Sequence, residues 1–434
     1  MERYGQILNI AMPAFLGLVL LEKLYGWIIK KESFKTMDML SSMSSGYTNV
    51  VKDVLGLSVS IISYGWMVKH WAVFQIESTV WTYIIAFVAI DFTGYWGHRF
   101  NHQINFLWNQ HLVHHSSEEF NLACALRQSI SSFVNFFTIF LLPAALLGVP
   151  AIVIATVGPL HLFAQFWYHT TYIGRMGFLE HIIVTPSHHR VHHAINPEYI
   201  DKNHGQIFII WDKLFGTFQE ELPHVPPVYG ITRPVQTWNP IKINFQHWWL
   251  LLQDAYHAQN WSDKLRIWFM PTGWRPADVA ERYPVHKIED VYHFEKYAPK
   301  TSKALSVWIW VQFLMTFFLI TYFFENIAKI GSPQIFLYGA FVFIGVYAYT
   351  ELMDRNPRAF WYEAVKNCIG LGWMGFSGDW FGMQAQYPWL YYALGAYFVI
   401  ATVVTAAFVW WDIRFDHTSA QSVAFATSQT KSSV

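Results

Sequence analysis

The sequence predicts an all-α protein whose helices cross a membrane several times. Hydrophobic residues make up 53% of the 434 residues and charged residues only 13%, which is about half the charged share of ordinary soluble domains. Aromatic residues reach 19% and include 22 Trp, and Trp and Tyr are enriched where a membrane meets water. A helix needs about 20 mainly apolar residues to cross a bilayer, and several stretches of this chain approach that length.

The candidate spans fall into two groups, separated by a long polar segment. In chain order they are Gln6–Leu24, Leu55–Phe74, Val80–Tyr95, Phe133–Leu147, Ala151–Phe166, Ala304–Phe324, Ile335–Tyr349 and Trp389–Trp411. The fourth and fifth stretches are short for full spans, so we expect a helical hairpin that turns inside the protein. The apolar stretch Gly370–Gly382 is rich in glycine, and the sequence leaves its crossing undecided.

The polar segment separates three predicted parts. Residues 1–78 hold N-terminal membrane helices, and residues 79–300 form a catalytic domain with a polar cap. Residues 301–434 form a second membrane unit and a short tail. The polar residues that follow the hairpin contain no clear span, and we therefore expect them to cover the active site.

Basic residues predict the orientation of the chain. The loop after the first span holds Lys30, Lys31 and Lys35, and loops rich in Lys and Arg stay in the cytoplasm. Counting spans from this loop places every histidine block described below on the same side. We therefore predict a multi-pass integral membrane protein whose active site faces the cytoplasm. The membrane would be the endoplasmic reticulum in a eukaryote or the inner membrane in a bacterium.

Histidine spacing indicates a metal site. Three blocks share a helical spacing, namely His98 with His102, then His111, His114 and His115, and finally His189, His192 and His193. Residues three and four apart lie on one face of an α-helix. Neutral imidazole binds iron, zinc, copper and nickel. Eight such side chains on three helices predict a site for two metal ions.

Three further residues are candidates because of their position beside these blocks. His169 follows the predicted hairpin on the same side and is a possible ninth ligand. His188 precedes the third block and is expected behind the ligands. Asp91 lies seven residues before His98 within a predicted span, where a carboxylate requires a partner. We expect Asp91 to accept a proton from a ligand imidazole, the alternative being a polar contact between helices.

The other histidines lack ligand spacing, and the sequence places them at the surface or the membrane interface. They are His70, His161, His181, His204, His224, His247, His257, His286, His293 and His417.

An all-histidine site favours oxygen chemistry over its competitors. It leaves positions open on iron, where O₂ can bind, whereas a catalytic zinc typically uses three protein ligands. A transporter would place ionisable groups near the bilayer midplane in paired repeats, and no repeat is evident. The formal net charge of zero gives no indication of a nucleic-acid partner. The two cysteines are too few for a thiolate metal site.

The three blocks resemble the fatty acid hydroxylase superfamily over roughly residues 80–220. This superfamily includes sterol desaturases, C4-methyl sterol oxidases and sphingolipid hydroxylases. A narrower resemblance, to the alkylglycerol monooxygenase family, covers nearly the whole chain. It rests on the stretches His111–Ser129, Thr185–His193, Ile200–Asn203, Ile210–Phe218 and Val228–Pro234.

The narrower resemblance implies a function and its cofactors. Two non-haem iron ions would be held by the eight block histidines, and O₂ would hydroxylate the ether carbon of an alkylglycerol. The product would break down to a fatty aldehyde and glycerol, with tetrahydrobiopterin as the reductant. Gln103 stands where the animal enzyme carries an acidic residue, so the sequence leaves the use of pterin open. Arg127 and Gln128, in a stretch typical of this subgroup, are expected to face the glycerol hydroxyls and the reductant. Oxidation of a sterol, carotenoid or sphingolipid is the alternative activity.

Overall fold

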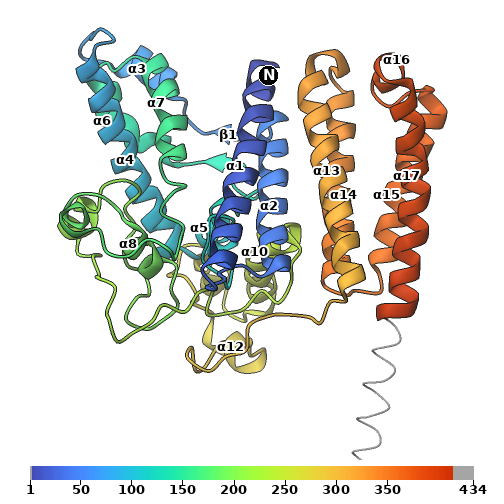
Figure 1. Ribbon diagram of the computed structural model, residues 1–434. Coiled ribbons are helices and arrows are strands. Elements are labelled where there is room, and N and C mark those ends of the chain that lie inside the picture. Colours follow the sequence, from blue (N-terminus) through green and yellow to red (C-terminus); the bar gives the residue numbers. More distant parts are fainter. Residues whose placement is uncertain (1, 414–434) are drawn as a thin grey trace, which may run out of the picture.

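The computed structural model describes residues 2–413, apart from the side chains of residues 2–4, and is almost entirely helical. The described residues contain two strands, β1 (Val59–Ser60) and β2 (Val134–Asn135), which pair in parallel over two residues each. The long helices stand side by side, and shorter helices and loops form a cap at one end of them (Figure 1). The predicted all-α class is confirmed.

Within residues 2–413, four helices are long and apolar enough to cross a membrane. They are Gly5–Ile28 within α1 (Glu2–Ile28), α13 (Lys303–Ile330), α14 (Gln334–Met353), and Pro388–Ile413, which joins α17 (Pro388–Ala407) to η4 (Phe408–Ile413). In α1 only 11% of the apolar window is buried inside the protein, so most of that helix presents apolar side chains outward, as a helix facing lipid does. The spans predicted near both ends of the chain therefore correspond to helices of spanning length.

The prediction of a span at Leu55–Phe74 is wrong. The chain there forms a turn, strand β1 and the eight-residue helix α3 (Tyr64–Trp71).

The predicted hairpin is present as short helices, η2 (Phe137–Leu141), α6 (Leu142–Leu146) and α7 (Ala151–Phe163). Its turn requires Gly148, which has a φ of +77° and would place a Cβ only 2.0 Å from the carbonyl oxygen of Phe74.

Two helices extend the sequence-based expectation. Helix α2 (Thr36–Val54) was not predicted, because its serine-rich sequence is not apolar, yet residues such as Ser42 and Ser44 are completely buried. Small side chains of this kind allow neighbouring helices to approach closely. Helix α15 (Ala359–Ser377) contains most of the undecided glycine-rich stretch and packs between α14 and α17.

The largest hydrophobic core joins the two ends of the chain. Helix α1 packs against α13, and α2 packs against α13 and α14. Buried residues of this core include Met39 and Val51 from α2, Phe313 from α13 and Val346 from α14. The N-terminal helices and the C-terminal membrane unit thus share one core.

The cap holds the ends of the segments that carry the histidine blocks. Helix α4 (Val80–Gln103) runs from a Thr79 N-cap down into the cap, and it continues the predicted third span through His98 and His102. The remaining helices of the structure are α5 (Asn105–His115), η1 (Cys124–Leu126), η3 (Gly177–His181), α8 (Pro186–His192), α9 (Ile210–Phe215), α10 (Pro240–His257), α11 (Trp261–Arg266), α12 (Ala277–Arg282) and α16 (Met383–Gln386). The lysine loop after α1 lies at the same end as the cap (Figure 1).

This arrangement predicts opposite accessibility for two loops. Single cysteines at Lys31, after α1, and at Ser332, between α13 and α14, should be labelled by an impermeant thiol reagent from opposite faces of the membrane. Both positions are exposed, and the exposed Cys368 is first replaced by Ser because it would otherwise react. Labelling of both positions from one face would contradict the arrangement.

Candidate metal centre

The chain brings the three blocks together through two turns and a short helix. Helix α4 ends at Gln103 because Ile104 is extended, with φ −116° and ψ 123°, and α5 begins directly afterwards. This sharp turn folds α5 back against α4, so their histidines face each other. Helix α8 begins with Pro186 in its first turn, a position that tolerates proline because the first N–H groups of a helix have no partner within it. It supplies the third block from the opposite side.

All nine predicted ligands fall into two groups. In each group the candidate ligand atoms lie within 4.8 Å of one another. The first group is His98, His102, His111, His115 and His192, and the second is His114, His169, His189 and His193. The two groups adjoin, since the rings of His115 and His193 stack with their centroids 4.3 Å apart.

Hydrogen bonds at the rear of the rings determine which nitrogen is free. The Nδ1 atoms of His98, His114, His169 and His192 lie 2.8–3.2 Å from the backbone carbonyl oxygens of His204, Arg127, Gln165 and Lys202, respectively. A carbonyl oxygen only accepts, so each Nδ1 carries the proton and each Nε2 presents a lone pair. Yet the Nε2 atoms of His169 and His114 lie only 3.3 Å apart. Two lone pairs held at this distance repel each other unless a positive charge lies between them.

The spacing of the front nitrogens fits a metal ion. The Nε2 atoms of His98 and His111 are 2.8 Å apart, and those of His189 lie 2.9 Å from His169 and 3.0 Å from His193. At a metal–nitrogen distance of about 2.1 Å, two ligands at a right angle lie about 3.0 Å apart. The Nε2 of His192 is buried and has no partner among the described residues. The donor sets therefore fit two divalent ions that bind imidazole.

Burial keeps the imidazoles in the form that binds metal. Desolvation lowers the pKa of His114 to about 3, assisted by the charge of His98 and opposed by the bond to the Arg127 carbonyl. The same cause lowers the pKa of His189 and His193 well below the usual range. Neutral rings at physiological pH offer lone pairs without the cost of removing a proton.

A strained loop supplies two of the carbonyl acceptors. Asp201 and Asn203 both have a positive φ, near +56° and +55°, which for non-glycine residues is uncommon. The Asn203 side chain fixes this shape by donating to the carbonyl oxygens of His188 and Gln219, at 3.1 and 2.8 Å. The loop thereby presents the Lys202 and His204 carbonyls to His192 and His98. His188 contributes through its main chain and belongs to neither group.

Two buried carboxylates hold the segment that follows this loop. Asp212 accepts the N–H groups of His204 and Gly205, both at 2.7 Å. Asp91 accepts the N–H of Ile207 at 2.8 Å and that of Phe208 at 3.1 Å. Asp91 also accepts from the Trp211 indole, at 2.8 Å.

Asp91 has a different histidine partner from the predicted one. Its Oδ1 lies 2.8 Å from Nε2 of His161 on α7, and His161 belongs to neither metal group. The offset of seven residues from His98 separates the two side chains by two helical turns, so Asp91 meets α7 rather than a ligand. The polar contact between helices, given above as the alternative, describes this geometry.

Arg127 and Gln128 do not have the predicted orientation. The Arg127 guanidinium is buried and donates to Asp38 Oδ1 at 2.7 Å and to the hydroxyls of Ser42 and Ser116. A buried arginine requires such a partner, so this side chain points away from the metal groups, and only its carbonyl meets His114. The exposed Gln128 side chain donates to the Ala125 carbonyl within its own turn.

A carboxylate on the first membrane helix contacts the residue that follows His169 of the second group. Glu22 of α1 is only 8% exposed. Its carboxylate accepts from the Thr170 hydroxyl at 2.6 Å and from the Leu122 N–H at 2.7 Å. Thr170 directly follows His169, so α1 anchors the segment that carries this candidate ligand.

Three histidines assigned to the surface are buried, and those predictions are wrong. His161 contacts Asp91, and His204 lies beside the first group, with its ring centroid 5.0 Å from that of His102. His247 donates through Nε2 to the carbonyl oxygen of Asn105 on α5, at 3.0 Å. Sequence spacing did not indicate their burial, because a loop or a neighbouring helix covers each of these side chains. His417 lies outside the described residues.

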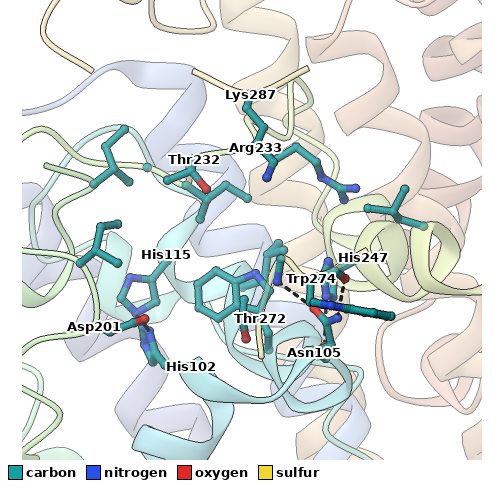
Figure 2. Close-up of a pocket in the computed structure, with 18 of the residues that line it drawn as sticks. His102, Asn105, His115, Asp201, Thr232, Arg233, His247, Thr272, Trp274 and Lys287 are labelled. Carbon is teal, nitrogen blue, oxygen red and sulfur yellow. Dashed lines mark hydrogen bonds and ion pairs between the residues drawn. The ribbon is translucent and has the colours of Figure 1, made fainter. Parts of the chain in front are cut away.

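A cavity of about 270 Å³ opens onto both metal groups from the cap. Its lining includes His102, His115 and His192 from the first group and His193 from the second. Figure 2 shows His102 and His115 on one side, with Trp274, His247 and Asn105 on another. A molecule in this cavity would contact the metal ligands directly.

Comparison with known proteins agrees with this geometry. The fatty acid hydroxylase family matches residues 83–217, which contain all nine histidines. Alkylglycerol monooxygenase of Homo sapiens is 33% identical over 372 residues, covering 84% of this chain and 82% of the human protein. Its counterpart in Danio rerio is 32% identical over 410 residues, covering 93% and 89%. This chain belongs to the alkylglycerol monooxygenase family.

More distant similarity covers less of the chain. Ornithine lipid hydroxylase OlsE of Rhizobium tropici is 27% identical over 191 residues, covering 44% of this chain and 54% of that protein. No solved structure matches this chain significantly. The predicted family is therefore confirmed by relatives that match along most of the chain.

Removal of a ligand should lower the metal content. We expect His192→Ala and His114→Ala each to lose bound metal and activity, because the remaining rings present too few lone pairs to one of the ions. Metal analysis of purified membranes measures this loss, and His224→Ala, at an exposed position, serves as the control. Full metal occupancy in either variant would contradict the assignment.

Loss of the Asp91 carboxylate should have a smaller effect. In Asp91→Asn the amide group repels some of the four donors that the carboxylate accepts, and the carbonyl-bearing segment loosens. Changes behind metal ligands typically lower affinity or activity roughly 10–100-fold, and we expect an effect of this size in a metal titration. The exposed Asp290→Asn is the matched control. An unchanged affinity would show that Asp91 only packs α4 against α7.

Proposed function

We propose that this family member is a di-iron lipid monooxygenase that cleaves the ether bond of alkylglycerols. The observation that carries the proposal is the pair of adjoining all-histidine groups, in which the unprotonated Nε2 atoms of His114 and His169 lie 3.3 Å apart. Iron bound there would retain open positions for O₂ and would supply the oxygen activation that hydroxylation of a C–H bond requires.

The proposed reaction balances with one external reductant. The carbon beside the ether oxygen gains a hydroxyl from O₂, while the second oxygen atom and two reducing equivalents form water. The resulting hemiacetal breaks its carbon–oxygen bond to give a fatty aldehyde and glycerol. Tetrahydrobiopterin is proposed as the reductant, as it is for the family that this chain resembles.

The residues of this chain position the histidine rings and exclude water from the reacting carbon. The carbonyls of Lys202, His204 and Arg127 hold ligand rings in one tautomer. Buried rings and the surrounding cap keep bulk water from the reacting carbon. The cavity admits a polar group from the cap side, while the long chain of the lipid extends toward the membrane helices.

The location of the groups relative to the membrane supports a shallow site. The lower end of α4, together with α5 and α8, which carry the histidine blocks, lies at the cap end of the upright helices, as does the loop after α1 (Figure 1). We propose that this end is cytoplasmic, in agreement with the basic loop. An ether bond at the glycerol end of a lipid lies at that depth, whereas a carbon at the middle of the bilayer does not.

Turnover in nanodiscs tests the proposal. Protein loaded with iron should release fatty aldehyde from hexadecylglycerol in step with O₂ consumption when reduced tetrahydrobiopterin is present. The variant His192→Ala controls for reactions of free iron. Hydroxylation of a sterol or ceramide without release of aldehyde would contradict the proposal and support the alternative activity, oxidation of a sterol or sphingolipid.

A further inference from the structure

The wall of the cavity carries two cations that form no ion pair with a described residue. Arg233, Arg275 and Lys287 all line it. Arg275 is neutralised by Asp254, to which its Nε and one terminal nitrogen donate at 2.6 and 2.8 Å. Among the described residues, Arg233 and Lys287 have no such acidic partner within 4.0 Å, and neither side chain donates a hydrogen bond to another group.

The cavity contains one carboxylate, and it lies with the histidines. Asp201 Oδ1 is 3.4 Å from Nδ1 of His102. Figure 2 shows Arg233 and Lys287 together on the other side of the view from His102. The side of the cavity formed by these two residues is therefore positively charged.

Arg233 is in an environment where a lone cation is unfavourable. Its side chain is half-buried, and burial, together with the charge of Arg275, lowers its pKa, while the charge of Asp254 opposes this shift. A buried charge normally has a partner. A second group also lacks one, since the Thr272 hydroxyl in the cavity wall is buried without a hydrogen bond. Both observations indicate a polar, anionic ligand rather than an apolar one.

We propose that Arg233 and Lys287 form a subsite for a phosphate group. Guanidinium donates two parallel hydrogen bonds to phosphate, and lysine adds a point charge. This inference rests on the proposed function, because it places the phosphate on the glycerol end of the ether lipid. The polar end of an alkylglycerol phosphate occupies the cavity, its ether carbon approaches the histidines, and its chain leaves toward the membrane.

The test compares two lipids that differ only in the phosphate. Binding and kcat/KM of hexadecylglycerol and hexadecylglycerol 3-phosphate are measured in nanodiscs for the wild type, Arg233→Met, Arg233→Lys and Lys287→Met. Lys296→Met is the control, because Lys296 pairs with Glu119 and lies outside the cavity. A hydrogen bond to a charged group contributes about 1.5–3 kcal/mol, so Arg233→Met should lower the preference for the phosphorylated lipid roughly 10–100-fold. Arg233→Lys and Lys287→Met should give intermediate losses.

Two further measurements complete the test. Inorganic phosphate that competes with hexadecylglycerol in the wild type but not in Arg233→Met would show that the subsite also accepts free phosphate. Direct binding of the phosphorylated lipid is measured without reductant, so it remains informative if no aldehyde forms and the proposed function fails. Equal affinity of wild type and both methionine variants for the phosphorylated lipid would overturn the subsite. Metal content of each variant shows that it has folded.

Discussion

Electrostatic repulsion between imidazole lone pairs is the constraint on which this structure depends. Four rings donate their Nδ1 protons to backbone carbonyls behind them, and the free Nε2 atoms of two of these rings, His114 and His169, lie 3.3 Å apart. Such an arrangement is unfavourable in the absence of a cation. Much of the cap serves as the framework that holds these nitrogens close together. In a site of this kind, the free energy of metal binding also stabilises the folded protein.

The segment from Asp201 to Asp212 illustrates how this framework is built. Its positive φ angles turn two carbonyls toward the ligands, and a loop of this shape is unstable without support. Asp212 fixes the loop from within the segment, and Asp91 fixes it from α4. These two carboxylates accept backbone N–H groups and do not contact the rings of the two groups. They hold the backbone whose carbonyls hold the rings, whereas Asp201 of the same segment lies 3.4 Å from Nδ1 of His102.

Periodicity predicted the grouping of the eight block histidines, because each block lies on one helix face. His169 was found from its position after the hairpin. The partners of Asp91, Arg127 and His204 could not be predicted, because no local sequence pattern indicates contacts between distant segments. Asp91 and His161, for example, are 70 residues apart in the chain. Helix α2 was missed for another reason. Its serine hydroxyls donate hydrogen bonds to backbone carbonyl oxygens, so a helix of low hydropathy can be buried among apolar helices.

Glu22 links the N-terminal helix to the segment that carries His169. During synthesis this helix emerges first, long before residues 169–193, and its carboxylate has no partner until Thr170 and Leu122 arrive. The backbone beside His169 therefore gains these two contacts only in a chain whose first helix is in place. A chain that is cut or misinserted at the N-terminus would lack them, even though all nine histidines of the two groups are present.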